Sequence, residues 1–258
     1  FTDFMHVPFS LRKLKRAYTK WQKGLEGRGW NMLYMENHDQ PRALSRFGDR
    51  ENYPYESATM LAALLYGMRG VPFIYQGQEL GLHDPTFQSL EEYRDIETLN
   101  AYAELRATGK WTDEELLAKM QYGSRDCGRV PMPWNNEKEG GFTTGTPWLK
   151  TQIDPGFTVA EQEEDPKSVL NFYRKLFELR KSIPALADGE FKLLWNEDDV
   201  SVYTRTAEGI TVYVVCNFSA EKKDLPDCFP RGGDILLNNY DTEKEWLRPY
   251  QALWIKTR

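Results

Sequence analysis

A short apolar segment that ends abruptly in a polar, charged cluster constrains this chain more than any other feature. The segment is Trp30-Asn31-Met32-Leu33-Tyr34-Met35, and the cluster that follows is Glu36-Asn37-His38-Asp39-Gln40-Pro41-Arg42. Because the apolar run lacks clean polar alternation, it predicts a strand buried on both faces, as in a parallel sheet covered by helices. Loops at the C-terminal edge of such a sheet are rigidly held yet face solvent, so these polar side chains are candidate functional residues.

The surrounding residues repeat this arrangement. Residues 10–25 and 56–69 read as helices with apolar faces, the second ending at Gly70. A second apolar strand, residues 71–75, ends in Gln76-Gly77-Gln78-Glu79. The order helix, strand, helix, strand predicts a βα repeat in which each strand finishes in polar residues.

The segment 81–164 is long and has little predicted regular secondary structure. One helix is predicted in it, near residues 112–120, with Thr112 as its cap. Such a long segment after a strand, with little regular secondary structure, more often has a function than not. A stronger helix is predicted to begin at Asp165-Pro166, a cap followed by a proline in the first turn, and to stop at Ile183-Pro184.

The residue pattern of the sequence changes near Ala187. Short runs rich in aromatic and β-branched residues follow at hairpin spacing, at residues 190–195, 200–206, 210–217, 234–237 and 252–256. They predict a small antiparallel β domain, and hence a division of the chain into residues 1–186 and 187–258.

Composition excludes several classes of function. The net charge is −6 with no evident basic stripe, which argues against nucleic acid and anionic membranes as partners. No apolar run reaches the ~18 residues of a membrane-spanning helix. Cys127, Cys216 and Cys228 are widely spaced and predict reduced thiols in a cytoplasmic protein, with a single disulfide as the alternative. No side-chain cluster has metal-ligand spacing, so the sequence names no metal ligand and does not decide metal dependence; no cofactor is expected.

The polar cluster itself has two interpretations. Asn, His and Asp in succession offer an amide, an imidazole and a carboxylate that together can bind several hydroxyls of a polar ligand. The same residues also favour an ordinary capped turn before Pro41. The local sequence pattern alone favours the turn. Further motifs along the chain favour the interpretation as a ligand site.

These motifs occur in one order over nearly the whole chain. They are Glu36 to Arg42, Ser45-Arg46-Phe47-Gly48-Asp49, Tyr75 to Gly81, Tyr93-Arg94-Asp95-Ile96-Glu97 with Asn100, Arg125-Asp126 through Arg129 to Pro131-Met132-Pro133-Trp134, and Gly141-Phe142-Thr143-Thr144-Gly145 before Pro147-Trp148. Together they resemble the α-amylase superfamily of glycoside hydrolases. The nearest resemblance is to the oligo-1,6-glucosidase and α-glucosidase branch, which also holds trehalose-6-phosphate hydrolases.

The resemblance implies a fold of α/β plus all-β class: the last two strands and the helices of a (β/α)8 barrel, then an antiparallel β-sandwich. Members of the family are roughly twice as long, so we expect this chain, which begins with Phe1, to be the C-terminal half of such a protein. The family's nucleophile and general acid belong to motifs that lie upstream of Phe1. A retaining glycosidase needs both carboxyl groups, so we expect the chain alone to be inactive.

The resemblance also assigns site residues. Asp39 matches the third carboxylate of the family, which stabilises the oxocarbenium-like transition state through sugar hydroxyls. His38 matches the adjacent hydroxyl-binding histidine, and Arg129 matches an arginine that closes the pocket. Glu36 is expected to point away from Asp39. Glu79 and Asp95 are expected to make loop hydrogen bonds or ion pairs. His6 and His83 have no companion residues in the sequence and are expected to be ordinary residues.

Three hypotheses follow. The first is half of a cytoplasmic α-glucosidase cleaving α-1,6 or α-1,4 bonds of short gluco-oligosaccharides, with a trehalose-6-phosphate hydrolase as its close alternative. The second is a sugar- or protein-binding homologue without catalysis. In the third, a separate N-terminal barrel half completes the fold, and the lone chain exposes sheet edges and self-associates.

Pro133 and Cys127 depart from the family's usual Gln and Asn, and Gln78 stands where Glu is common. These departures leave the identity of the substrate open.

Overall fold

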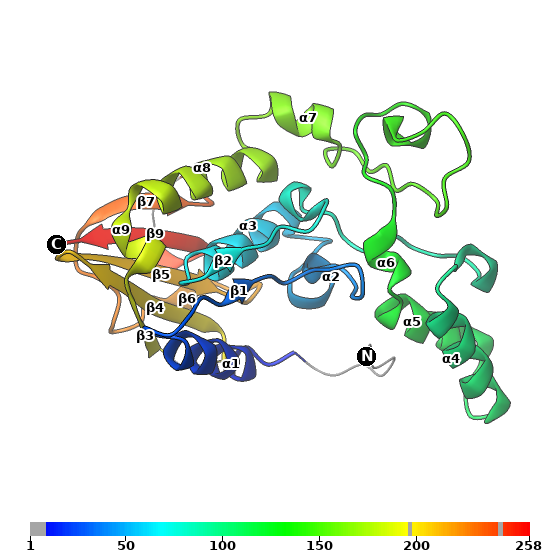
Figure 1. The fold of residues 1–258 in the computed structure, drawn as a ribbon, viewed down its shortest axis with the longest axis horizontal. Coiled ribbons are helices and arrows are strands. Elements are labelled where there is room, and N and C mark those ends of the chain that lie inside the picture. Colours follow the sequence, from blue (N-terminus) through cyan, green and yellow to red (C-terminus); the bar gives the residue numbers. More distant parts are fainter. Residues whose placement is uncertain (1–8, 196–197, 242–244) are drawn as a thin grey trace.

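The structure, a computed structural model, describes residues 9–195, 198–241 and 245–258. His6, which the sequence treats as ordinary, lies outside these residues. A five-stranded antiparallel sheet forms one end of the molecule, and helices α4 (Ile96–Ala107) and α5 (Asp113–Gly123) form the other end (Figure 1). In the part of the chain that is described, no helix has the length and apolar character to cross a membrane.

The two predicted apolar strands pair in parallel. Strand β1 (Met32–Leu33) aligns with β2 (Val71–Pro72) in the register Met32 to Val71 and Leu33 to Pro72. The prediction that residues 30–35 are buried on both faces is wrong, because Leu33 is fully buried whereas Met32 is 55% exposed. Helix α3 (Pro54–Tyr66) covers one face of this small sheet, and no described element covers the other.

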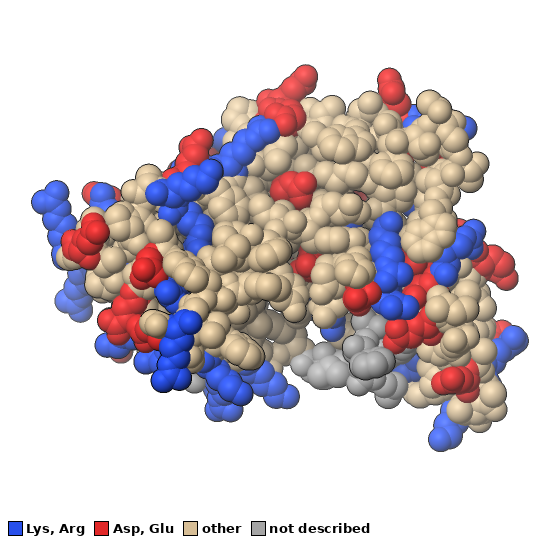
Figure 2. Space-filling view, in the orientation of Figure 1, with Lys and Arg blue, Asp and Glu red and all other residues tan. Residues whose placement is uncertain are grey.

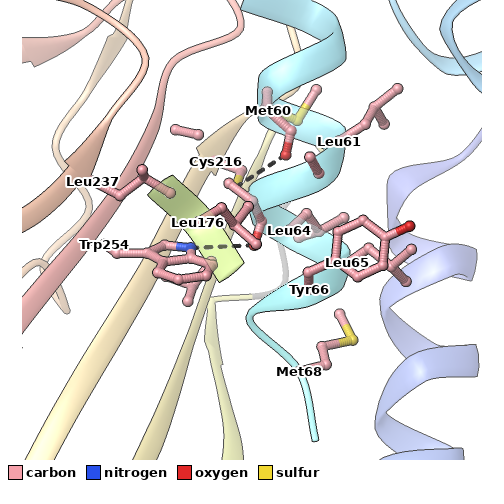
Figure 3. Packing of buried hydrophobic residues seen from close by; sticks show 14 of the residues in the cluster. Met60, Leu61, Leu64, Leu65, Tyr66, Met68, Leu176, Cys216, Leu237 and Trp254 are labelled. Atoms are coloured by element: carbon pink, nitrogen blue, oxygen red, sulfur yellow. Dashed lines mark hydrogen bonds between the residues drawn. The ribbon is translucent and has the colours of Figure 1, made fainter. Parts of the chain in front are cut away.

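Helix α3 is the centre of the main core. All its residues from Ser57 to Tyr66 are buried, as expected of a helix that is apolar on every side. One side packs against the antiparallel sheet, where Trp254 Nε1 donates to the Ala63 carbonyl at 3.2 Å (Figure 3). Its predicted end at Gly70 is wrong, since the helix ends at Tyr66 and Gly67 is the C-cap.

The first helix, α1 (Leu11–Gly24), has Ser10 as its N-cap and confirms the prediction for residues 10–25. Helix α5 also confirms its prediction, because Thr112 and Glu115 form a capping box. The helix predicted from Asp165 begins later: α8 (Val169–Ser182) has Ser168 as its N-cap, whose Oγ accepts from the Asn171 N–H at 3.2 Å. Asp165 instead stabilises a turn before helix α8, where its Oδ1 accepts from the Lys167 N–H at 2.9 Å.

Five α-helices of the described residues were not predicted from the sequence. Besides α4 they are α2 (Ala43–Phe47), α6 (Asp126–Arg129), α7 (Val159–Glu164) and α9 (Pro184–Asp188). Helices α4 and α5 surround a cluster of buried side chains that is separate from the core around α3: Phe87, Tyr93, Tyr102, Leu116, Met120 and Cys127. We call residues 85–130 the lobe.

The C-terminal sheet confirms the five predicted strands. They are β3 (Glu190–Trp195), β4 (Val200–Ala207), β5 (Ile210–Asn217), β7 (Asp234–Asn238) and β9 (Ala252–Thr257), in the order β3-β4-β5-β9-β7. One face packs on α3, and the other packs beneath a two-stranded sheet of β6 (Lys223–Asp224) and β8 (Trp246–Leu247). The three cysteines are free thiols, as predicted.

Candidate active site

The polar cluster after β1 folds as a turn that presents its side chains to solvent. The Asn37 side-chain oxygen accepts from the Asp39 N–H at 2.8 Å, and the Gln40 N–H donates to the Asn37 carbonyl. This local hydrogen bonding leaves the His38 side chain 70% exposed and the Asp39 side chain 51% exposed. His38 Nε2 lies 3.3 Å from Asp39 Oδ2. The structure therefore confirms the capped turn, and this turn leaves the side chains of His38 and Asp39 accessible.

Arg129 reaches this turn from the end of α6. Its Nε donates to the His38 carbonyl at 2.6 Å, and its Nη2 donates to Asp39 Oδ1 at 3.0 Å. The contact bridges residues 90 positions apart in the sequence. The structure thus brings together all three residues that the sequence selects, His38, Asp39 and Arg129.

Sequence reasoning missed Arg125 as a member of the site. Arg125 lies one helical turn before Arg129, and its Nη1 is 3.7 Å from Asp39 Oδ1. Its Nη2 and Nε donate to Asp95 Oδ1 at 2.5 and 3.0 Å. The four-residue spacing of two arginines around a short helix was the available signal, because side chains at that spacing share a face.

Asp95 anchors this arginine pair. Burial alone would raise the pKa of Asp95, but hydrogen bonds from Arg125 and Thr98 and the charges of Arg125 and Arg129 outweigh it and hold that pKa below its ordinary value. The expected ion pair of Asp95 with a nearby arginine is confirmed. Asp126 fixes the backbone here, accepting from the N–H groups of Arg94 and Asp95 at 2.6 and 2.8 Å.

Gly128 lets α6 lie directly against the turn. A Cβ atom at this position would lie 2.7 Å from the Gln40 carbonyl oxygen and 3.1 Å from the Asn37 carbonyl oxygen. No ordinary Cβ makes the first of these contacts, so any larger residue must push α6 away. Arg125 and Arg129 would then move away from Asp39.

Glu36 lies beneath the turn and points away from Asp39, as predicted. It is buried, and it accepts from the Ala43 N–H at 2.9 Å and from Arg42 Nη1 at 3.0 Å. Arg42 also donates to the Gln76 carbonyl at 2.6 Å, which ties the end of β1 to the end of β2. Burial raises the pKa of Glu36 despite its contacts with Arg42.

Two further carboxyl groups lie near this buried pair. The Arg42 N–H donates to Asp84 Oδ1 at 2.7 Å, and burial raises the pKa of Asp84 to about 7. Burial also raises the pKa of Glu79, against hydrogen bonds from the backbone of Gly77 and of Glu79 itself. These bonds agree with the loop role expected for Glu79, but its Oε2 is buried with no hydrogen-bond partner among the described residues.

His83 has polar neighbours in the folded chain that the sequence did not indicate. Its Nε2 lies 3.4 Å from Asp154 Oδ2, and its Nδ1 lies 3.2 Å from Gln152 Nε2. The excursion that carries Gln152 and Asp154 folds back onto His83, some 70 residues earlier. Sequence spacing cannot reveal such a contact.

The geometry at Asp39 suits a polar, uncharged ligand. One exposed carboxylate, one imidazole and two guanidinium groups surround a small region, and together they can both donate to and accept from hydroxyl groups. Within residues 9–195, 198–241 and 245–258, no group of three or more His, Cys, Asp or Glu side chains is placed to hold a metal ion.

Comparisons with known proteins identify the family of this chain. The family profile described as "Alpha amylase, catalytic domain" matches residues 2–189. The oligo-1,6-glucosidase of Halalkalibacterium halodurans is 45% identical over 95% of this chain and 46% of its own length. The trehalose-6-phosphate hydrolase of Escherichia coli is 40% identical over 93% of this chain and 45% of its own.

Solved structures show the same relationship. The crystal structure of Bacillus licheniformis trehalose-6-phosphate hydrolase superposes with a TM-score of 0.91 at 34% identity, covering 98% of this chain and 48% of that one. The chain spans about half the length of the relatives it matches. The profile match and the shared fold show that this chain belongs to the α-amylase family of glycoside hydrolases.

Proposed function

We propose that this chain is the C-terminal part of a retaining α-glucosidase that hydrolyses α-1,6 or α-1,4 glucosidic bonds of short gluco-oligosaccharides. The observation that carries the proposal is the exposed Asp39 carboxylate at the end of β1, held by Arg129 at 3.0 Å beside His38. Relatives named oligo-1,6-glucosidase, 40–45% identical to this chain, support the same substrate class.

In this proposal residues 1–186 are the last part of a (β/α)8 barrel and residues 187–258 are a β-sandwich domain. The parallel pairing of β1 with β2 supports the first assignment. The antiparallel sheet that begins at Glu190, directly after α9, supports the second. The free thiols support a cytoplasmic location.

Each site residue has a defined part in the reaction. Asp39 accepts hydrogen bonds from two neighbouring hydroxyls of the sugar whose bond breaks, and these bonds strengthen as positive charge develops on the ring. Arg129 holds the Asp39 carboxylate and limits the pocket, while His38 donates to a third hydroxyl. The nucleophile and the general acid come from the upstream half that relatives carry, so the chain alone does not complete the reaction.

A trehalose-6-phosphate hydrolase is the second candidate, favoured by the TM-score of 0.91 to the B. licheniformis enzyme. The two activities share the chemistry at Asp39 and differ in the group beyond the scissile bond. Comparing isomaltose with trehalose 6-phosphate as substrates decides between them.

The test is release of p-nitrophenol from p-nitrophenyl α-glucoside. We expect the purified chain alone to be inactive, and to become active when it is mixed with the upstream half of the H. halodurans enzyme. Asp39→Asn should then lower the rate about 10²–10³-fold, the usual effect of losing one transition-state hydrogen-bonding group. The control is Asp241→Asn, which changes an exposed carboxylate paired with Lys167 at 2.7 Å and should leave the rate unchanged.

Two results would contradict the proposal. Hydrolysis by the chain alone that is lost in Asp39→Asn would place the missing carboxylates within these residues. Sugar binding by the mixed halves without hydrolysis would support the non-catalytic homologue instead.

A further inference from the structure

Helix α1 concentrates positive charge in an acidic protein. Its 14 residues include six Lys and Arg and no Asp or Glu, so the helix carries +6. The chain as a whole carries −6, and the residues outside α1 therefore carry −12. Figure 2 shows Lys and Arg side chains gathered along the lower edge of the molecule, where α1 lies in Figure 1. The expectation that the chain has no basic stripe is therefore wrong for this helix.

Four of these cations form a single row, which we call the basic stripe. They follow one another at spacings of three, four and three residues, which places them on one side of the helix, and all four are exposed: Lys13, Arg16, Lys20 and Lys23. At 1.5 Å of rise per residue, the stripe is about 15 Å long. Among the described residues, none of the four takes part in an ion pair, whereas the neighbouring Arg12 pairs with Asp198 at 3.3 Å.

The basic stripe opposes the stability of its own helix. Like charges three or four residues apart on a helix repel each other. Arg12 and Lys13 also lie in the first turn, where the helix dipole favours negative charge, and no acidic residue occupies that turn. Local charges that destabilise a helix and find no partner within the fold indicate a function outside the fold.

The surface beside the stripe is low on one side and aromatic beyond it. Ala17 and Gly24 are exposed and lie four residues after Lys13 and Lys20, on the same side of α1. A Cβ atom at Gly24 would have no neighbouring atom within 4 Å, so the space above it is open. Trp21, 54% exposed, lies next to these two residues on the side away from the stripe. The backbone of another helix can therefore approach α1 closely here.

We propose that the exposed side of α1 binds an acidic helical segment of a partner protein. Carboxylates three and four residues apart on that segment pair with the basic stripe, and its backbone lies over Ala17 and Gly24. Trp21 packs against an apolar side chain of the same segment. Trp and Arg are the side chains that most often carry the binding energy of protein interfaces, and Trp21 and Arg16 supply one of each.

The fold disfavours an anionic membrane as the partner. A helix that binds in the membrane interface inserts its apolar face among the lipids. The apolar face of α1 is already occupied, because Leu11 is buried and Leu14 and Tyr18 pack against the main core. The stripe can therefore reach lipid headgroups only by surface charge.

The charge distribution disfavours a nucleic acid. A duplex or an extended strand continues beyond a stripe of about 15 Å and carries its negative charge along its whole length. It would meet exposed Glu26 just after one end of α1 and exposed Asp198 beside the other, on a chain whose remaining residues carry −12. A short acidic segment that matches the stripe in length avoids this repulsion.

Fluorescence anisotropy with a labelled acidic peptide tests the proposal. The probe is a helical peptide of about 20 residues whose glutamates repeat the spacing of the basic stripe. The comparison peptide has the same composition, with its glutamates spread around the helix. We expect the matched peptide to bind about tenfold more tightly or better, and its affinity to fall as salt rises from about 50 to about 200 mM. Equal affinity for the two peptides would overturn the proposal.

Charge reversal locates the contact. Lys20→Glu should weaken binding of the matched peptide by about tenfold or more, because it replaces an attraction in the middle of the stripe by a repulsion. The control, Lys110→Glu, makes the same change of net charge at an exposed lysine between α4 and α5 and should leave the affinity unchanged. Equal losses for the two variants would show a response to net charge alone and would overturn α1 as the binding surface.

Urea unfolding of Lys20→Glu separates binding from folding. A glutamate at this position lies between Arg16 and Lys23, so it removes two repulsions within α1 and adds two attractions. The urea midpoint should therefore equal or exceed that of the wild type while binding is lost. A lower midpoint would show that the stripe stabilises the fold, and would overturn its role in recognition.

Added bulk distinguishes an acidic helix from other polyanions. Ala17→Phe adds volume without charge where the partner's backbone should lie, so it should weaken binding of the matched peptide by about tenfold. Ala103→Phe, at an exposed alanine of α4, is the control and should have no effect. An RNA of about 20 nucleotides and phosphatidylserine vesicles respond chiefly to charge. Tighter binding to either of these than to the matched peptide, undiminished by Ala17→Phe, would overturn the protein partner.

Discussion

At the scale of single residues, the carboxyl groups around the turn respond to burial in opposite ways. At Asp95, hydrogen bonds from Arg125 and Thr98 and two arginine charges outweigh burial and hold the pKa below its ordinary value. At Asp84, burial outweighs one backbone hydrogen bond and the charge of Arg42, and the pKa rises to about 7. The lowered pKa of Asp95 therefore stabilises the folded protein at pH values above the pKa of the unfolded state, and this stabilisation is lost as pH falls. At Asp84 the pKa is raised, so ionisation of this carboxyl group destabilises the folded protein.

Asp84 should make the protein less stable as pH rises. Its ordinary pKa is 3.8 and its folded-state pKa is about 7, so between these values the folded state binds more protons than the unfolded state. The free energy of unfolding then falls as pH rises through this window. Asp84→Asn keeps an oxygen that can accept from the Arg42 N–H but does not titrate. Relative to the wild type, the variant should gain about 2–3 kcal/mol between pH 5 and pH 8.

Urea unfolding at the two pH values measures this gain. Asp241→Asn, at an exposed carboxylate, is the control and should show no pH-dependent difference of this size. A difference between Asp84→Asn and wild type that is the same at pH 5 and pH 8 would show that Asp84 does not titrate in the window.

At the scale of elements, two buried arginines, one on helix α8 and one on strand β4, bind carbonyls at the ends of other helices. Arg180 of α8 donates to the carbonyls of Tyr66, Met68 and Leu186 at 2.6–3.2 Å and to that of Gly70 at 2.7 Å. Arg205 of β4 donates to the carbonyls of Gly67, Leu186 and Gly189 at 2.8–3.1 Å. Both guanidinium groups thus cap the C-terminal ends of α3 and α9, where helix carbonyls lack partners and favour positive charge.

Replacing Arg205 should loosen this junction. Burial lowers the pKa of Arg205 to about 10, yet its planar fork satisfies three carbonyls that a lysine ammonium cannot reach together. Arg205→Lys should cost about 2–4 kcal/mol of unfolding free energy, because it leaves buried carbonyls unpaired. The exposed Arg231→Lys is the matched control and should stay within about 0.5 kcal/mol. Equal urea midpoints for the two variants would contradict the capping role.

The same scale shows what the sequence can and cannot predict. The strands of the antiparallel sheet were predictable because β-branched and aromatic residues fill each run between turn residues. Helix α4 was not, because of its twelve residues only Thr98 and Tyr102 are buried and they form no continuous apolar stripe. For the site, one contiguous motif holds His38 and Asp39, but the link of Arg125 to Asp95 joins residues 30 apart through folding of the lobe.

At the scale of the whole molecule, the candidate active site lies where the lobe contacts the turn after β1, and the lobe and the main core have separate hydrophobic clusters. The main core runs from Leu33 through α3 to Trp254 and unites the helical part with the antiparallel sheet. The lobe has its own cluster, which includes Met120 and Cys127. Arg129 and Gly128 of α6 connect the lobe to the turn at residues 37–40. The geometry of the candidate site therefore depends on how the lobe packs against the main core as well as on the internal structure of each part.

The cysteines allow this division to be measured. Cys127 is fully buried in the lobe, Cys216 is fully buried in the main core, and Cys228 is only partly buried. Burial raises the pKa of both buried thiols, so each should react with a thiol reagent only after its own region opens. Because the lobe's cluster is much smaller than the main core, its opening should cost less free energy. In the Cys228→Ser variant, pulsed labelling in rising urea should therefore modify Cys127 at a lower concentration than Cys216. Coincident midpoints would show instead that the lobe and the core unfold as one cooperative unit, and that the arginines of α6 are held as rigidly as α3.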